Sequence, residues 1–358
     1  MDVADVVDER VLAESARAEF LGGRGYLAAC TTGLPTRSTR RAVQNDLEAA
    51  AAGHPDVMAY SAAVESSRAS FARLVGAEPE RVAIGSQASV MAALVAGSLP
   101  DNAVVLCADG DFSSIVLPFV HAGRGIRVRT APLAGLADAV TSDTDLVVFS
   151  LVQSATGEVA DADAITASAR RHGARTLCDA TQAVGWLPVD ARMFDAVVCH
   201  AYKWLCAPRG VAFLALAPDF AATLRPIFAG WYAGEDPWTS CYGHEVELAA
   251  DARRFDLSPA WQAFIGAAPA LRLFADLDPY ALHAHATGLA TGFREAMSLG
   301  TPDRPSAIVT WVDRDGCDLA RLTAAGITAS GRAGRARVAF HLFNDSTDVD
   351  LALRALGR

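Results

Sequence analysis

The sequence His200-Ala201-Tyr202-Lys203-Trp204-Leu205-Cys206-Ala207-Pro208-Arg209-Gly210 directly follows the short apolar run Ala196–Cys199. That run is typical of a strand buried on both faces. A lysine at the end of such a strand, between two aromatic residues, is a candidate for an amine with a lowered pKa, because burial penalises the ammonium form. The neutral amine can form a Schiff base with an aldehyde. The simpler alternative is a surface lysine whose stem packs against the two rings.

An acidic residue ends a second predicted strand. Asp179 follows the run Thr176–Cys178 and precedes Lys203 by 24 residues. In an open α/β sheet both strand ends lie at the carboxyl edge, where ligands bind. An aspartate there can pair with the protonated pyridine nitrogen of pyridoxal phosphate, so that the ring accepts the electrons of a Cα carbanion. As a single residue Asp179 is equally consistent with a helix N-cap, and the pair with Lys203 is the more specific signal.

The composition narrows the class of protein. With 52% hydrophobic and 20% charged residues, the 358-residue chain is expected to fold around a sizeable core. Its net charge of −10 argues against a nucleic-acid partner and against adhesion to anionic membranes. No apolar stretch approaches the roughly 20 residues of a membrane span, and the first residues lack the features of a signal peptide, so we expect a cytoplasmic protein. Cysteine and histidine spacings predict neither disulfides nor a metal site.

A series of short apolar runs predicts the strands of an α/β sheet. These runs are Val82–Ile84, Val104–Cys107, Ile126–Arg129, Leu146–Ser150, Thr176–Cys178, Ala196–Cys199 and Val211–Leu216. Helices are expected between several of them, for example at Ser86–Gly97 and at Asp161–His172, with Gly173 ending the second helix. The strand–helix–strand order predicts a mainly parallel central sheet with right-handed crossovers.

The pattern changes after about residue 217, where prolines and glycines punctuate a loop-rich stretch that precedes a helix at Ala260–Leu277. Beyond it we expect strands at Ala307–Val312 and Arg337–His341 and helices at Asp318–Ala325 and Asp345–Leu356. We therefore expect a large α/β domain over residues 15–260. A small α+β C-terminal domain over residues 261–358 follows, to which residues 1–14 can return.

The lysine stretch and its upstream aspartate resemble the pyridoxal-phosphate site of the class V aminotransferase superfamily. This group of fold-type I enzymes includes cysteine desulfurases, kynureninases, serine–glyoxylate-type aminotransferases and isopenicillin N epimerases. The run Lys203–Gly210 is most similar to epimerase-like members, and the similarity extends from Tyr26-Leu27 to the segment Arg337–Asn344. The resemblance implies a fold-type I transferase with pyridoxal 5′-phosphate on Lys203 and Asp179 at the pyridine nitrogen.

Two further segments match the cofactor site of the superfamily. Ser86, Gln87 and Ala88 follow a predicted strand and open a helix, whose backbone N–H groups and dipole can receive a phosphate. By resemblance these three residues bind the phosphate of the cofactor, although Ser86 is also an ordinary N-cap. Phe112 stands where the family stacks a ring on the pyridine, and its alternative role is that of a core phenylalanine.

The resemblance assigns more cofactor ligands. Gln182 matches the residue that hydrogen-bonds the phenolic oxygen, and His200 and Tyr202 match phosphate ligands. Kynureninases carry a tyrosine immediately before the lysine whereas desulfurases carry a histidine, so Tyr202 departs from the desulfurase pattern. Ser258-Pro259 resembles a loop that reaches the phosphate of a neighbouring subunit, which implies a homodimer with shared active sites.

Substrate contacts are expected from three places. Arg337 resembles the arginine that binds the α-carboxylate of an amino acid, a role that suits a planar guanidinium. Arg332 and Arg335 lie close by, and a solvated arginine at the start of a strand is the plainer alternative. Ser154 stands where desulfurases tend to have asparagine. Trp231 opens an aromatic loop that can wall a substrate pocket or pack at a dimer interface.

The expected reaction begins at the Cα atom of an α-amino acid joined to the cofactor by a Schiff base, with Lys203 as general base. Transamination is the leading expectation. The alternatives are a β-eliminating C–S lyase, an amino-acid epimerase of a specialised pathway and, outside enzymes, a pyridoxal-phosphate-binding sensor. The loop 328–335 has no cysteine, and Cys317 lies 20 residues before Arg337, so a desulfurase persulfide mechanism is not expected.

Overall fold

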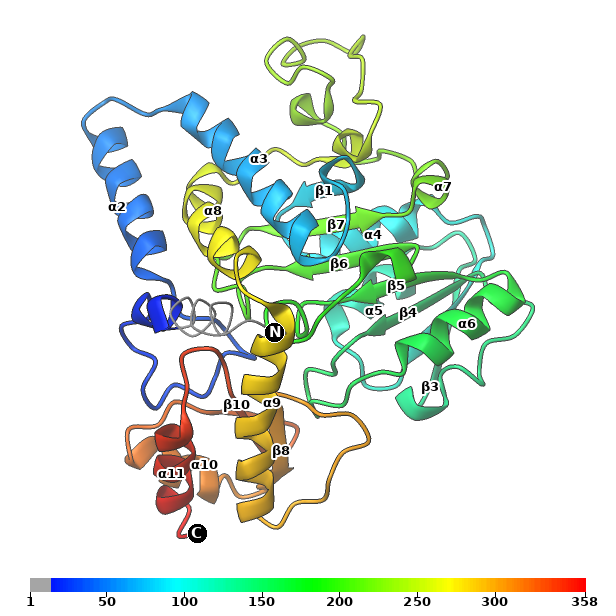
Figure 1. Ribbon diagram of the computed structural model, residues 1–358. Helices are drawn as coiled ribbons and strands as arrows, with labels where there is room; N and C mark the ends of the chain where they lie inside the picture. The colour runs from blue at the N-terminus through cyan, green and yellow to red at the C-terminus, as the bar shows by residue number, and fades with distance from the viewer. Residues whose placement is uncertain (1–13) are drawn as a thin grey trace, which may run out of the picture.

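The computed structural model describes residues 14–358 and contains two β-sheets (Figure 1). The larger is a 7-stranded sheet in the order β1-β7-β6-β5-β4-β2-β3. Its strands are β1 (Val82–Gly85), β2 (Val104–Ala108), β3 (Arg127–Ala131), β4 (Leu146–Ser150), β5 (Arg175–Asp179), β6 (Ala196–His200) and β7 (Ala212–Leu216). Within this sheet β7 runs antiparallel to its neighbours β1 and β6, and the other pairs are parallel. The expected, mainly parallel central sheet is confirmed.

Helices cover both faces of the large sheet. On one face pack α3 (Val57–Leu74), α6 (Ala162–His172) and α8 (Trp261–Ala275), and on the other pack α4 (Ala88–Ser98), α5 (Ser113–Val120) and α7 (Pro218–Ala221). Neighbouring residues of β4 alternate between the two cores, with Phe149 in the first and Val148 in the second. Burial on both faces explains why these strands read as continuous apolar runs rather than as alternating ones.

The smaller unit is a 3-stranded antiparallel sheet with helices against it, as expected for the α+β part (Figure 1). It consists of β8 (Ile308–Val312), β9 (Ser330–Arg332), β10 (Arg335–Ala339), α9 (Pro279–Ala296), α10 (Cys317–Ala324) and α11 (Ser346–Ala355). Strand β9 was not expected, and β10 begins two residues before the expected strand. Both follow from a tight hairpin in which Ala333 and Gly334 have positive φ (49° and 70°).

The two cores meet near the junction of α8 and α9. Phe264 and Leu271 of α8 belong to the core of the large sheet, whereas Phe293 of α9 belongs to the core of the small one. Core packing thus puts α8 with the large unit, while the expected boundary after residue 260 stays a prediction. The segment expected to return to the small domain, residues 1–14, lies almost wholly outside the described residues. Close after it, Tyr26 and Ala28 bridge to Thr328 and Ala339.

Two further segments meet the cores differently: α2 (Arg37–Ala51) has little buried surface, whereas the loop-rich stretch after β7 contributes Tyr232 and Phe255 to the cores. Helix α2 has Thr39 as its buried residue and lies at the edge of the molecule, against α8 (Figure 1). The loop-rich stretch after β7 contains the short 3₁₀ turns η4 (Trp231–Ala233) and η5 (Ala252–Phe255). No helix in the described part of the chain, residues 14–358, is both long enough and apolar enough to span a membrane.

Candidate active site

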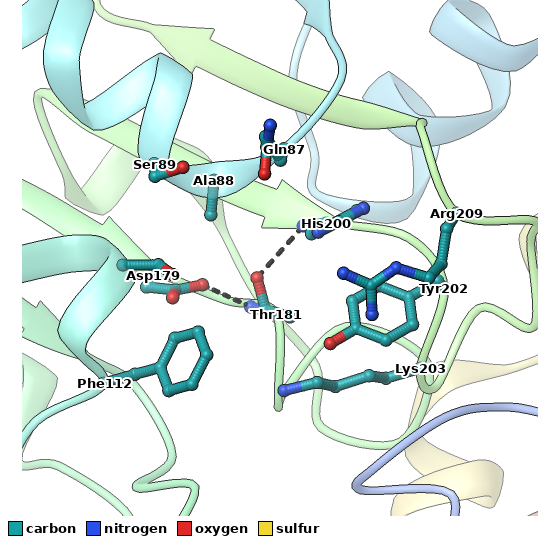
Figure 2. Close-up of a pocket in the computed structure, with 11 residues that line it drawn as sticks. Gln87, Ala88, Ser89, Phe112, Asp179, Thr181, His200, Tyr202, Lys203 and Arg209 are labelled. Carbon is teal, nitrogen blue, oxygen red and sulfur yellow. Dashed lines mark hydrogen bonds between the residues drawn. The ribbon is translucent and has the colours of Figure 1, made fainter. Parts of the chain in front are cut away.

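A pocket opens at the carboxyl edge of the large sheet, where β1, β5 and β6 end (Figure 2). It is lined by Gln87, Ala88, Ser89, Phe112, Ser114, Asp179, Thr181, His200, Tyr202, Lys203 and Arg209. Most of the cofactor ligands expected from the sequence are therefore brought together. The expected residues that do not line this pocket are Ser86, Ser154, Gln182, Trp231, Ser258 and Arg337.

Lys203 is buried in this pocket, with 5% of its surface exposed. Its Nζ lies 5.3 Å from the ring centroid of Phe112 and 5.7 Å from that of Tyr202, and it makes no hydrogen bond with the described residues. Burial lowers the pKa of Lys203 to about 8, against the opposing attraction of Asp179. The neutral fraction at pH 7 is thereby about two orders of magnitude above that of an ordinary lysine. Lys203 is also the single lysine of the chain.

The backbone around Lys203 is held by a close approach from the N-terminal segment. The Gly33 amide donates to the Tyr202 carbonyl at 2.8 Å. A Cβ atom on Gly33 would lie 2.1 Å from the carbonyl oxygen of Lys203, so no other residue fits there without displacing the lysine. Cys206 has a φ of 54°, a strained value for a residue with a side chain. These contacts fix the turn that aims Lys203 into the pocket.

Trp204 anchors the same turn from two other sides. Its indole Nε1 donates to Gln182 Oε1 at 2.8 Å, and its carbonyl lies 2.9 Å from His341 Nε2. His341 comes from the segment after β10, and its ring stacks on Trp204 at an interplanar angle of 13°. The lysine turn is therefore shared between the large and small units.

Asp179 ends β5 and faces the pocket with 4% of its surface exposed. The amide of Thr181 donates to its Oδ1 at 2.8 Å. Burial raises the pKa of Asp179, and the hydrogen bonds from Thr181 and the charge of Lys203 oppose that rise. A buried carboxylate with so few donors is stabilised by a cation placed against it. A protonated pyridine nitrogen fits this requirement.

The other end of the pocket is suited to an anion. His200 Nε2 is buried and has no hydrogen-bond partner among the described residues. Burial, reinforced by the charge of Arg209, lowers the pKa of His200 to about 4, so its ring is neutral at pH 7. Helix α4 starts beside it at Gln87, whose side chain does not cap the helix. Uncapped N–H groups and an unpaired ring nitrogen together fit a phosphate group.

A second cluster lies around Gln182. Its Nε2 donates to the carbonyl of Cys30 at 2.8 Å and to Ser154 Oγ at 3.0 Å. Both donors and the acceptor of this amide are therefore in use. A hydrogen bond from Gln182 to a cofactor oxygen requires one of these bonds to be exchanged, and the assignment of Gln182 stays a prediction.

Arg337 belongs to the same cluster and is almost completely buried, with 1% of its surface exposed. Its Nε donates to Ser330 Oγ at 3.0 Å, one terminal nitrogen donates to Thr31 Oγ1 at 2.8 Å, and the other donates to the carbonyl of Ser154. Burial lowers the pKa of Arg337, and the nearby charge of Arg332 adds to this. The structure thus brings Arg337 and Ser154 together, with neutral oxygens around the guanidinium.

Three expected residues lie elsewhere. Trp231 Nε1 donates to Ser258 Oγ at 3.2 Å, and the Trp231 ring packs 5.3 Å from that of Trp238. Ser258 is exposed. Ser86 lies in the turn before α4 but outside the pocket lining.

The pocket also contains residues that sequence reasoning missed. Ser89 and Ser114 lie in the first turns of α4 and α5, and Thr181 follows Asp179. Arg209 stands within the lysine stretch itself, six residues after Lys203, and its guanidinium lies 4.4 Å above the ring of Tyr202. Its closeness to the lysine in the chain was the signal that could have found it.

Comparison with known proteins agrees with this geometry. A family model described as Aminotransferase class-V matches residues 26–300. An uncharacterised aminotransferase, YcbU, from Bacillus subtilis (strain 168) is 29% identical over 260 residues, which cover 69% of this chain and 68% of that protein. The isopenicillin N epimerase of Streptomyces clavuligerus is 32% identical over 182 residues, and the match spans 46% of each chain. Other relatives carry the names kynureninase and probable cysteine desulfurase.

Solved structures show the same fold. The cysteine desulfurase CsdA from Escherichia coli superimposes with a TM-score of 0.81 over 97% of this chain and 98% of that one, at 19% identity. The architecture is that of fold-type I pyridoxal-phosphate enzymes, as the sequence predicted.

Proposed function

The chain belongs to the aminotransferase class-V family and uses pyridoxal 5′-phosphate, and we propose that it transfers the amino group of an α-amino acid to a keto acid. The observation that carries the proposal is Lys203, a single buried amine with a lowered pKa that faces a buried carboxylate across one pocket. When bound, the cofactor withdraws electrons from the Cα atom of the amino acid.

Different residues of the pocket hold different parts of the cofactor. Lys203 supplies the covalent attachment, because its neutral amine is the nucleophile an aldehyde requires. Asp179 holds the pyridine nitrogen in its protonated form, and Phe112 supplies an apolar platform beside it. The uncapped start of α4 and the neutral ring of His200 would hold the phosphate.

Lys203 also moves the proton. Once free, its amine would take the proton from Cα and return it, on the same side, to the carbon of the cofactor that carried the aldehyde. Two rings lie near its Nζ, that of Phe112 at 5.3 Å and that of Tyr202 at 5.7 Å, and of these only Tyr202 carries a hydroxyl proton. One base serving one side suffices for transamination, whereas epimerisation requires a proton donor on the opposite side. The single amine of Lys203 is therefore sufficient for amino transfer.

Two other outcomes begin with the same proton removal. β-Elimination by a C–S lyase and epimerisation stay the second candidates, and a relative named isopenicillin N epimerase supports the latter. A persulfide mechanism has no support, because the hairpin before Arg337 contains no cysteine and Cys317 begins α10. Arg337 is proposed to bind the substrate carboxylate in each case, with Ser154 beside it.

The experiment that tests the proposal is product analysis. The holoenzyme is incubated with a panel of amino acids and cysteine S-conjugates, with and without an added keto acid, and the products are identified by mass. One keto acid per active site and an aminated cofactor support transamination. Pyruvate with a free thiol means β-elimination, and inverted substrate means epimerisation. The Lys203→Ala protein is the control for reactions that free pyridoxal phosphate carries out alone.

We also propose a homodimer with shared active sites. Ser258 and Trp231 are hydrogen-bonded to each other outside the pocket of their own chain, and Ser258 is exposed. Large apolar side chains are exposed on α2 and α3, at Leu47 (49%) and Met58 (69%). Sedimentation analysis gives the assembly state. Mixing Lys203→Ala with Ser258→Trp chains should restore activity in hybrid dimers, because one site in each hybrid is then intact.

A further inference from the structure

Arg209 has a place in the pocket that the family resemblance does not explain. Its guanidinium lies 4.4 Å from the ring centroid of Tyr202 and faces the same space as His200 (Figure 2). It makes no hydrogen bond and no ion pair with the described residues, 14–358, so its five N–H groups are unused by the protein there. The Tyr202 ring holds the guanidinium plane in one orientation.

The charges that line the pocket do not balance for a bound phosphate. Apart from the neutral His200, the acidic and basic side chains that line the pocket are Asp179, Lys203 and Arg209. Lys203 is used by the covalent bond, and Asp179 is used by the pyridine nitrogen. A phosphate monoester carries a charge of about −1.5 to −2 at pH 7. Arg209 is what remains among the lining residues of the described chain to neutralise it.

His200 does not supply this charge. Its buried imidazole is neutral at pH 7, and the charge of Arg209 is one of the causes. A neutral His200 can donate one hydrogen bond from Nε2, and the start of α4 can donate backbone N–H groups. These groups orient a phosphate but carry no full positive charge.

We propose that Arg209 is the residue that neutralises the cofactor phosphate in this protein, with its guanidinium held by the ring of Tyr202 and its N–H groups donated to the phosphate oxygens. The inference rests on the proposed function and adds a specific determinant to it. It also gives Tyr202 a second role, since the ring that lies beside Lys203 is the surface on which Arg209 is positioned. Arginine suits this role because its fork of donors matches phosphate oxygens in pairs.

A competing role for Arg209 is structural. The same side chain borders a second, apolar cavity formed with α2, which Arg40 also lines. There Arg209 could pack the Tyr202 ring or contact a partner chain without touching the cofactor. The two roles predict different ligand dependences. If Arg209 only packs against Tyr202, its replacement should affect ligands with and without a phosphate equally.

The test compares two ligands and four proteins. Wild-type apoprotein, Arg209→Gln, Arg209→Lys and the control Arg40→Gln are titrated with pyridoxal 5′-phosphate and with pyridoxal, which lacks the phosphate. Binding is followed by the absorbance of the bound aldehyde and by fixation with borohydride, which in this chain has Lys203 as its single lysine target. No catalytic turnover is needed.

Arg209→Gln should weaken pyridoxal 5′-phosphate binding by about 10- to 150-fold, the loss expected for charge-assisted hydrogen bonds, and change pyridoxal binding less than about twofold. Arg209→Lys should lie between Arg209→Gln and wild type, and Arg40→Gln should match wild type for both ligands. Equal weakening of both ligands by Arg209→Gln, or no weakening of either, overturns the inference while the proposed function stands. A wild-type protein that fixes no cofactor on Lys203 overturns both.

Discussion

The two ends of the site differ in how many of their buried polar groups are hydrogen-bonded within the protein. Around Lys203 the groups are left open: the amine makes no hydrogen bond with the described residues, and His200 Nε2 has no partner. The guanidinium of Arg337, by contrast, donates hydrogen bonds to Ser330, Thr31 and Ser154. The Lys203 end suits a ligand that remains bound. Buried polar groups without a hydrogen-bond partner cost free energy until a ligand pairs with them. The Arg337 end has its polar groups paired without a ligand, which suits a substrate that binds and dissociates in each turnover.

This difference also predicts how binding proceeds. A substrate carboxylate at Arg337 must replace neutral oxygens that already accept from the guanidinium, so only the difference between a charged and a neutral acceptor is gained. The hydroxyls of Thr31 and Ser330 can turn aside more easily than the carbonyl of Ser154. In the role proposed for Arg337, selectivity for a carboxylate would come from this exchange of hydrogen-bond acceptors rather than from an empty, positively charged pocket.

The largest effect is expected from removing the open amine. Lys203→Ala should abolish covalent cofactor attachment and lower turnover by about 10²- to 10⁴-fold or more, because both the nucleophile and the base for the Cα proton are lost. The absorbance of the bound cofactor and steady-state rates measure the two effects separately. Normal attachment in this variant would contradict the proposed site, since the chain has no second lysine.

The next effect concerns the carboxylate at the same end. Asp179→Asn should still bind the cofactor through Lys203 and the phosphate groups, but turnover should fall by on the order of 10- to 100-fold, the loss of one charge-assisted hydrogen bond. Turnover is compared at saturating cofactor. Asp190→Asn is the control, because it makes the same change at a carboxylate that pairs with Arg192 outside the pocket. Wild-type turnover in Asp179→Asn would remove this residue from the role.

At the paired end the effect should fall on substrate affinity. Arg337→Ala should raise the KM for amino acids by about 10- to 150-fold and leave cofactor affinity within about twofold. The matched control is Arg335→Ala on the same strand, whose guanidinium donates to Thr310 instead. If Arg335→Ala raises KM and Arg337→Ala does not, the carboxylate site has been assigned to the wrong arginine.

The fold could be predicted in large part because its strands are buried on both faces. Strand β4 was expected at Leu146–Ser150 and is found there. A short, continuous apolar run between turns is typical of a strand that is buried on both faces. The hairpin before β10 could not be read, because one of its two left-handed positions is Ala333 rather than glycine. Helices α2 and α3 were not expected, although each begins at a side-chain N-cap, Thr36 and Asp56 respectively.

The site could be predicted where chemistry follows directly on a strand. Asp179 and His200 are the last residues of β5 and β6, and Lys203 comes three residues later. Contacts between distant segments could not be predicted. No spacing in the sequence indicates that Arg337 donates hydrogen bonds to Thr31 and Ser154. Local spacing identifies strand-end residues, whereas partners brought together by the tertiary fold require the structure.

The last effect is a change of stability in the apoprotein, and it tests the Lys203 end of the site without any ligand. Replacing Lys203 by methionine removes a buried amine whose pKa, at about 8, is lower than the 10.5 of a free lysine. Below pH 8 both the folded and the unfolded chain carry the proton, and the folded chain bears the full cost of a buried ammonium. Lys203→Met should therefore be more stable than wild type at pH 7, by on the order of 3 kcal/mol.

The sign of the pH dependence follows from the same two pKa values. Between pH 8 and about 10.5 the unfolded chain binds a proton that the folded chain does not, so wild-type stability rises with pH in this window relative to Lys203→Met. Urea unfolding of both apoproteins from pH 7 to 10.5 measures the gap, and other titrating groups cancel in the difference. The gap should be widest at pH 7 and should close toward pH 10.5. A gap that does not change with pH would mean that the folded protein holds Lys203 as an ordinary, solvated ammonium, and the contrast between the two ends of the site would then be wrong.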